Sequence, residues 1–289
     1  MHNKKICETN EEEWDLVIKP KEGWFDINIA ELFRYRDLIF MFVRRDFVTF
    51  YKQTILGPLW FIIQPLVNTL VFTIIFGRIA KVSTDGTPPF LFYMTGTIAW
   101  GYFSTCLTAT SNTFVQNANI FGKVYFPRLT VPVSHVIINL LQFGIQFMIF
   151  VGFWLWFKWQ GADFHLGYMI AAIPFVLFQM AVLGLGFGIL ISSLTTKYRD
   201  LTFAMSFCVQ LWMYATPIVY PLSVVPEKYH VLVALNPMAS VVECFRGAFL
   251  GVSTIQPTHI LISVIITAIV FLLGVILFSR IEKTFMDTV

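Results

Sequence analysis

The feature that most constrains this chain is a run of 25 residues without a charged side chain, from Gln53 to Gly77, which reads QTILGPLWFIIQPLVNTLVFTIIFG. About 20 consecutive apolar residues span the roughly 30 Å hydrocarbon core of a bilayer as a helix. The run therefore predicts a membrane span. It also contains Gly57, Gln64 and Asn68, which a simple anchor does not require. We expect this segment both to cross the membrane and to line a polar space.

Five further uncharged runs follow and predict five more spans. They are residues 86–122, with its span at about 90–111; 129–157; 164–196; 201–226; and 247–279, with its span at about 258–279. The whole chain is 57% hydrophobic and 13% charged, whereas soluble domains are about 25% charged. The sequence therefore predicts an all-α integral membrane protein with six transmembrane helices. A net charge of only +3 gives no indication of nucleic-acid binding.

The distribution of basic residues predicts the orientation of the spans. The first 28 residues are polar and lack the pattern of a cleavable signal peptide, so we expect a cytosolic N-terminus. Six spans then return the C-terminus to the same side. In this orientation 15 Lys and Arg residues lie in cytosolic segments and 5 lie in external ones. This asymmetry agrees with the positive-inside rule and indicates a multi-pass protein with both termini cytosolic.

A basic amphipathic stretch precedes the first span. Asn28 with Glu31 three residues later is typical of a helix N-terminus. A basic amphipathic helix beside a span lies in the headgroup plane, with its cations near anionic membrane lipid; a solvated cytosolic helix is the alternative. The chain thus divides into a cytosolic segment, residues 1–28, an amphipathic interface helix region, residues 29–52, and a six-helix transmembrane domain, residues 53–289.

The segment between the fifth and sixth spans has its own pattern. Tyr229 to Val242 is uncharged but is broken by Asn236 and Pro237, so each half is too short to cross a bilayer. Proline suits the first turn of a helix, with Asn236 as its cap. Glu243 and Arg246 follow three residues apart. We expect two short helices that re-enter from the external face, surrounded by protein or water; a hairpin lying on the external surface is the alternative.

The sequence contains little that could support catalysis. The spans hold no carboxylate pair, which argues against an ion-coupled carrier, and no acidic or histidine site is assembled for a membrane transferase. Gly122 and Lys123 lack the upstream glycine of a phosphate-binding loop. We expect no catalytic residue, no metal and no cofactor in this chain. The four scattered cysteines predict small buried hydrophobic residues: Cys7, Cys106, Cys208 and Cys244.

Aromatic and amide side chains within the spans are the candidates for contact with a polar molecule. Unpaired amides are unfavourable in hydrocarbon, so they need a neighbouring helix or a hydrated channel. Trp and Tyr at span ends are usually interface anchors, which is the alternative for several of these residues. Aromatic faces beside polar groups suit sugar rings. The candidate channel residues are Trp60, Gln64, Asn68, Trp100, Phe103, Gln210, Trp212 and Tyr214.

Five motifs occur in order over nearly the whole chain. They are RYRDLIFMFVRRDFVTFYKQTILGPLWFIIQPL, NANIFGKVYFPRLTVPV, KYRDL, ATPIVYP and VPEKYHVLVALNPMASVVECFRGAFLG. In this order they resemble the membrane subunit of ABC type-2 exporters of polysaccharides, the family that exports O antigen, capsule and teichoic acid. Drug exporters share the architecture and are a further alternative for the substrate.

The resemblance implies partners and roles. It implies a homodimer in the cell inner (plasma) membrane that works with two ATP-binding-cassette subunits, which bind the ATP and Mg²⁺. It implies export of a lipid-linked glycan, with O antigen as the first candidate, through a channel at the dimer interface, and external re-entrant helices at residues 225–250. It also implies contact with the ATPase through Arg34, Arg36, Asn117, Lys123, Tyr125, Arg128, Arg199 and Asp200.

Overall fold

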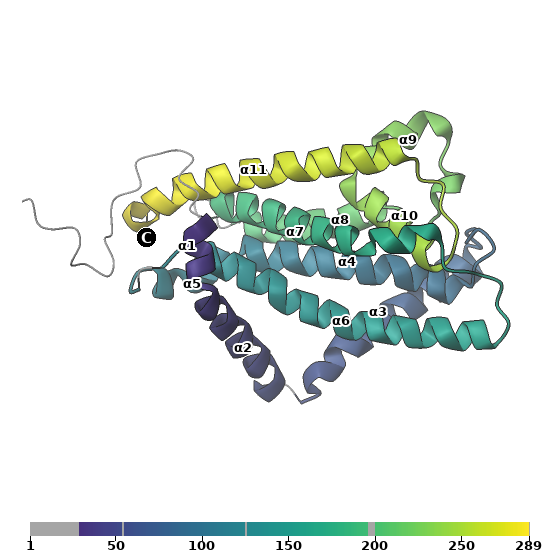
Figure 1. Ribbon diagram of the computed structural model, residues 1–289, viewed down its shortest axis with the longest axis horizontal. Helices are drawn as coiled ribbons and strands as arrows, with labels where there is room; N and C mark the ends of the chain where they lie inside the picture. The colour runs from purple at the N-terminus through teal and green to yellow at the C-terminus, as the bar shows by residue number, and fades with distance from the viewer. Residues whose placement is uncertain (1–28, 54, 125, 196–199, 289) are drawn as a thin grey trace, which may run out of the picture.

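The computed structural model describes residues 29–53, 55–124, 126–195 and 200–288. Within these ranges every element of regular secondary structure is a helix. Figure 1 shows the long helices running along the longest axis of the molecule. The predicted cytosolic segment, residues 1–28, lies outside the described residues, and so does the predicted cap Asn28.

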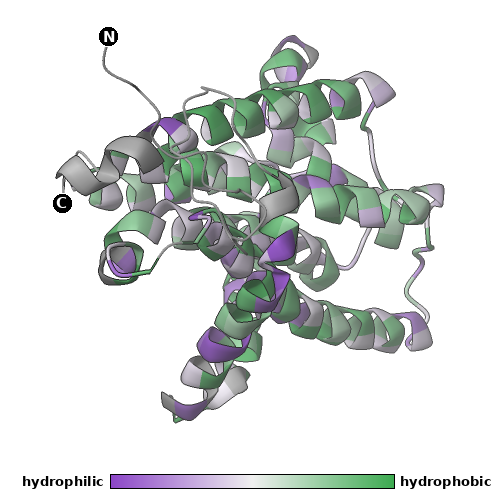
Figure 2. Cartoon of the chain, turned by 60° about the vertical axis from the view of Figure 1, so that its left-hand side comes forward, coloured by the Kyte–Doolittle hydropathy of each residue, from purple (hydrophilic) through white to green (hydrophobic). Residues whose placement is uncertain are grey.

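The bundle is built around α4 (Pro89–Ser111), which packs mainly against α6 (Thr130–Trp159) and α7 (Ile173–Thr195) and also contacts other helices. Helix α11 (Pro257–Thr288) packs on the other side of α7. The main hydrophobic core lies between these helices, and hydrophobic residues cover most of their length in Figure 2. The predicted all-α membrane fold is therefore confirmed in its general form.

Glycines allow α7 to approach both of its neighbours closely. A Cβ atom at Gly184 would lie 2.8 Å from Cβ of Cys106 on α4, and one at Gly186 would lie 2.9 Å from Cα of Phe271 on α11. Small residues are typical of helix interfaces in membranes, where close backbone packing replaces the hydrophobic effect. The two faces of α7 thus hold α4 and α11 in the same bundle.

The predicted amphipathic helix forms as two pieces, α1 (Ile29–Arg34) and α2 (Arg36–Gln53). Helix α2 leaves the bundle, and the chain returns along α3 (Trp60–Phe72) and a π-helical turn at Thr73–Ile79, as Figure 1 shows. The reversal uses Gly57, whose φ of 50° is unfavourable for other residues. The first spanning helix therefore begins after this turn, later than the predicted start at residue 53.

The number of spans can be compared with the prediction of six. Among the described residues, four helices are long and apolar enough to cross a membrane, namely Trp60–Ile79, Thr130–Trp159, Tyr168–Thr195 and Pro257–Arg280. A bent helix pair would make a fifth. Helix α4 is long enough but rich in Thr and Ser, and α8 (Leu201–Ala215) has 15 residues. At 1.5 Å per residue, α8 is only about 22 Å long. Six spans thus remain a prediction.

The fifth predicted span, residues 201–226, does not continue as a helix to its end. Helix α8 ends at Ala215, and Thr216 has an extended conformation with ψ of 141°. The reason is local, because the ring of Pro217 disfavours the helical conformation for the residue before it. The chain then runs as a non-helical connector to a short 3-10 turn at Leu222–Val224.

The two short helices predicted after this connector are confirmed as α9 (Glu227–Ala234) and α10 (Pro237–Phe249), which meet at 97°. Asn236 caps α10, since its Oδ1 accepts a hydrogen bond from the backbone nitrogen of Met238 at 3.1 Å. All 13 residues of α10 are buried. This helix is therefore enclosed by α4, α7 and α11 and does not lie on a free surface.

The two ends of the bundle differ. Helix α1, helix α5 (Thr113–Phe121) and the C-terminal part of α11 lie at one end, and α9 lies near the other, as Figure 1 shows. Half of the segment between α4 and α6, residues 113–130, is helical. A second aromatic core joins α5 to its surroundings, with the rings of Phe114 and Phe278 stacked at 4.7 Å.

Candidate transport site

Three of the predicted channel residues share one face of α3. Trp60, Gln64 and Asn68 are spaced four residues apart, so they lie one above the other. All three are exposed in the single chain, Trp60 to 46%. Amide groups are unfavourable against lipid, so this polar stripe needs water or another protein surface. The structure thus brings these residues together, in the arrangement that the sequence spacing implies.

Helix α8 carries a second exposed stripe. Gln210 and Tyr214 lie four residues apart on it, and both are exposed. Helices α3 and α8 both pack against α4. Five of the eight predicted channel residues therefore lie on the exposed faces of two helices that border the same central helix.

The other three predicted channel residues form an aromatic cluster inside the chain. The ring of Trp212 lies 6.0 Å from Trp100, 5.1 Å from Phe103 and 5.0 Å from Phe187. Trp100 is 5% exposed and Phe103 is fully buried. The indole nitrogen of Trp212 donates to Oδ1 of Asn236 at 3.1 Å. The cluster therefore packs α8 against α4 and α7 and connects it to the cap of α10.

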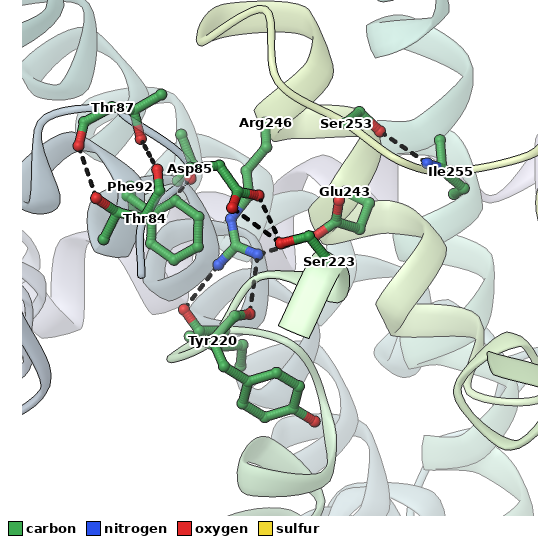
Figure 3. A network of polar contacts seen from close by, with 12 residues as sticks. Thr84, Asp85, Thr87, Phe92, Tyr220, Ser223, Glu243, Arg246, Ser253 and Ile255 are labelled. Atoms are coloured by element: carbon green, nitrogen blue, oxygen red, sulfur yellow. Dashed lines mark hydrogen bonds and ion pairs between the residues drawn. The ribbon is translucent and has the colours of Figure 1, made fainter. Parts of the chain in front are cut away.

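A buried ion pair lies where α10 meets the connector after α8 (Figure 3). Nη1 of Arg246 lies 2.9 Å from Oε1 of Glu243, and the two residues are 1% and 3% exposed. Nη2 of Arg246 donates to the carbonyl of Ile218 at 2.7 Å, and Nη1 donates to that of Tyr220 at 3.4 Å. The guanidinium lies 3.7 Å from the ring centre of Phe92, where a cation is attracted by the ring face. Arg246 thus holds α10, the connector and the start of α4 together.

A second polar contact in Figure 3 joins two loops at the same end of the bundle. The hydroxyl of Ser223 donates to Oδ1 and Oδ2 of Asp85 at 2.8 and 3.0 Å. Asp85 sits in a turn that is closed by reciprocal bonds, in which the hydroxyl of Thr84 donates to the carbonyl of Thr87 at 2.8 Å and the reverse bond is 2.7 Å. The loop before α4 and the connector after α8 are therefore attached to each other.

The predicted ATPase contacts are distributed over the opposite end. Among them, Arg34, Arg36, Lys123 and Asp200 are exposed. Arg128 is half-buried, with its guanidinium 5.7 Å from the ring of Phe121. Asn117 is buried, and its Nδ2 donates to the carbonyl of Thr113 at 3.0 Å. Tyr125 and Arg199 lie outside the described residues.

A cavity of about 570 Å³ near the α5 end, with both polar and apolar walls, was not predicted. It lies between α2, α3, α5 and α6, and its wall includes His135, Asn139 and Gln142 of α6. These three residues follow a helical spacing of four and three, so a polar stripe on an otherwise apolar span was readable in the sequence. Among the described residues, no group of three His, Cys, Asp or Glu side chains could hold a metal ion.

Comparison with known proteins adds independent information. Two proteins from Klebsiella pneumoniae, each named O-antigen export system permease protein RfbA, are 27% and 28% identical over 271 residues, which cover 90% of this chain and 96% of each relative. The protein of the same name from Myxococcus xanthus is 27% identical over 227 residues, 76% of this chain and 83% of that relative. The family model described as ABC-2 type transporter matches residues 37–250. The chain therefore belongs to the ABC-2 type transporter family.

Proposed function

We propose that this chain is the membrane subunit of an ATP-driven exporter that moves a lipid-linked polysaccharide, O antigen, from the cytosol to the outer side of the inner membrane. The observation that carries the proposal is the similarity along nearly the full length of this chain to permeases named for O-antigen export. The family membership supports a transport subunit. ATP hydrolysis then belongs to two separate ATP-binding-cassette subunits, which also bind Mg²⁺.

The proposed topology has six crossings. Helices α3, α4, α6, α7 and α11 supply five, and α8 with its extended connector supplies the sixth. The length of α4 and the four apolar helices support this arrangement. Helix α10 would be re-entrant from the external face, which its burial and the 97° bend support. Both termini would be cytosolic, in agreement with the position of α1 and the end of α11 at one end of the bundle.

The polar stripes on α3 and α8 support a channel between two copies of the chain. The stripes are exposed in the single chain, and a second copy facing them would enclose a space lined by amides and aromatic rings. Such a surface suits a glycan, because hydroxyl groups can bond the amides while the apolar faces of sugar rings lie on Trp and Tyr. The aromatic cluster around Trp212 would then support the wall from behind.

The proposal is tested by deleting the gene for this chain in its host. We expect surface O antigen to disappear and lipid-linked glycan to accumulate inside the cell, and a plasmid copy to restore export. Intact O antigen after deletion would refute the proposal. Loss of capsule, teichoic acid or drug resistance instead would assign another substrate. Failure to co-purify with an ATP-binding-cassette protein would favour an ion-coupled carrier or a membrane transferase.

The channel wall is tested in the same complemented strain. Gln64→Leu with Asn68→Leu should reduce export about tenfold or more, because each lost hydrogen bond to a neutral group is worth about 0.5–1.5 kcal/mol and the glycan contacts the wall repeatedly. Leu70→Ala is a matched control, since this exposed residue lies on a different face of α3. Normal export by the double variant would place the channel elsewhere.

The proposed ATPase contact is tested by charge reversal. Lys123→Glu should leave membrane insertion and ATP hydrolysis intact but should uncouple hydrolysis from export, because Lys123 is exposed beside α5. Lys228→Glu at the opposite end of the bundle is the control, and it should export normally. Equal export by both variants would remove Lys123 from the contact.

A further inference from the structure

The cavity at the α5 end has features of a binding site that the transport function does not explain. Its volume of about 570 Å³ lies within the usual range of small-molecule sites, about 300–1,000 Å³. Helix α2 contributes Arg45 and Asp46 to the wall, and α5 contributes Gln116. Phe47 and Phe61 add apolar surface. The cavity thus combines charged, amide and aromatic groups from four helices.

The wall of the cavity on α6 contains buried polar groups. Two of its nitrogens, Nε2 of His135 and Nδ2 of Asn139, are buried without a hydrogen-bond partner among the described residues. Asn139 is only 9% exposed, and the thiol of Cys106 beside it is a weak acceptor. Buried polar groups in proteins are nearly always bonded to protein or water. These two nitrogens lie beneath the cavity surface and give this side of the wall a polar character, while the side chains that reach the cavity from α2 carry full charges.

The cavity wall contains one positive and one negative side chain, Arg45 and Asp46. Nε of Arg45 bonds Oδ1 of Asp46 at 2.7 Å, and the Arg45 guanidinium lies 4.8 Å from the ring centre of Phe42. A guanidinium has five N–H donors, so this bond leaves Arg45 able to bind an oxyanion as well. A ligand with several negative charges would meet the Asp46 carboxylate directly. A zwitterion fits better, because its phosphate can approach Arg45 while its ammonium approaches Asp46.

The position of the cavity indicates where such a zwitterion comes from. Helix α2 is the basic amphipathic helix that we place in the headgroup plane, and the cavity lies between it and the spans α3 and α6. We propose that the cavity binds one zwitterionic phospholipid of the cytosolic leaflet, with a primary ammonium headgroup as in phosphatidylethanolamine. Its headgroup contacts Arg45 and Asp46, and its acyl chains follow the aromatic wall. The lipid thereby fixes α2 against the first span, whichever substrate is exported.

The proposal is tested with the full-length protein in detergent, by native mass spectrometry with added phosphatidylethanolamine, phosphatidylcholine or phosphatidylglycerol. Phosphatidylethanolamine should be retained about tenfold more than phosphatidylglycerol, since one charge-assisted bond is worth about a factor of ten. Phosphatidylcholine should rank between them, because its methylated ammonium cannot donate to Asp46. Arg45→Gln should lose about tenfold in retention of phosphatidylethanolamine.

Two further variants separate lipid binding by the charged pair from a purely structural effect on the fold. Arg44→Gln removes the same charge from the exposed neighbouring position and should leave retention unchanged. Asp46→Asn should reverse the order of the two lipids, lowering phosphatidylethanolamine and raising phosphatidylglycerol. Equal retention by Arg45→Gln and Arg44→Gln would overturn the proposal. Tighter binding of phosphatidylglycerol or of a lipid diphosphate by the wild type would also overturn it.

Discussion

Replacing Arg246 with methionine removes the centre of the polar network at α10 while preserving much of the side-chain volume. The carboxylate of Glu243, 3% exposed, then loses its partner at 2.9 Å. Removing one partner of a buried pair costs about 3–5 kcal/mol. The carbonyls of Ile218 and Tyr220 also lose their donor, at about 1 kcal/mol each. We therefore expect Arg246→Met to lower the free energy of unfolding by about 5 to 7 kcal/mol.

The assay is reversible unfolding of the purified chain in a mixed detergent, followed by Trp fluorescence. A double-mutant cycle with Glu243→Gln separates the pair from its surroundings, because the double variant Glu243→Gln with Arg246→Met buries no charge. We expect the double variant to be more stable than Arg246→Met alone. Lys228→Met is the control, since this exposed cation of the same hairpin should change stability by less than about 0.5 kcal/mol. Additive effects of the two network substitutions, or a loss below about 1 kcal/mol for Arg246→Met, would refute the reasoning.

Two further predictions concern packing. Gly274→Ala should destabilise the protein by about 1–3 kcal/mol, because a Cβ atom there would lie 2.5 Å from the carbonyl oxygen of Gly186. Gly144→Ala is the control and should be neutral, since a Cβ atom at Gly144 would meet nothing within 4 Å. Thermal unfolding of both variants checks this prediction, and equal melting temperatures would contradict it. Trp212→Phe should keep the aromatic packing but lose the bond to Asn236, at a cost of about 1 kcal/mol; an unfolding curve that matches the wild type would contradict it.

The parts of the fold that depend on adjacent residues could be predicted from the sequence. Asn236 and Pro237 act as the N-cap and the first-turn residue of a helix in any tertiary context. The predicted start of α10 and the predicted break before it were therefore correct. Pro217 likewise indicates where α8 ends, but the predicted span extended past it to residue 226. The helical spacing of His135, Asn139 and Gln142 was also present but became meaningful only with α2 beside it.

The parts that depend on distant segments could not be predicted. The spacing of Glu243 and Arg246 predicts a surface pair as readily as a buried one. Its burial requires the connector carbonyl of Ile218 and the ring of Phe92, which lies more than 150 residues earlier in the chain. The division of the predicted channel residues into an exposed group and a buried group also depends on distant segments of the chain. Trp60 and Trp100 are equally aromatic, but only α4 is surrounded by other helices of its own chain.

The contact between Asp85 and Ser223 has a mechanical consequence. Together with Arg246, it joins the loop before α4 to the segment between α8 and α10, so the ends of three helices at one end of the bundle are held together. A passage that widened inside the chain would have to break these contacts in every cycle. A passage between two chains would leave these contacts intact. These contacts therefore agree with the channel that we propose between two copies of the chain, because such a channel does not require them to break.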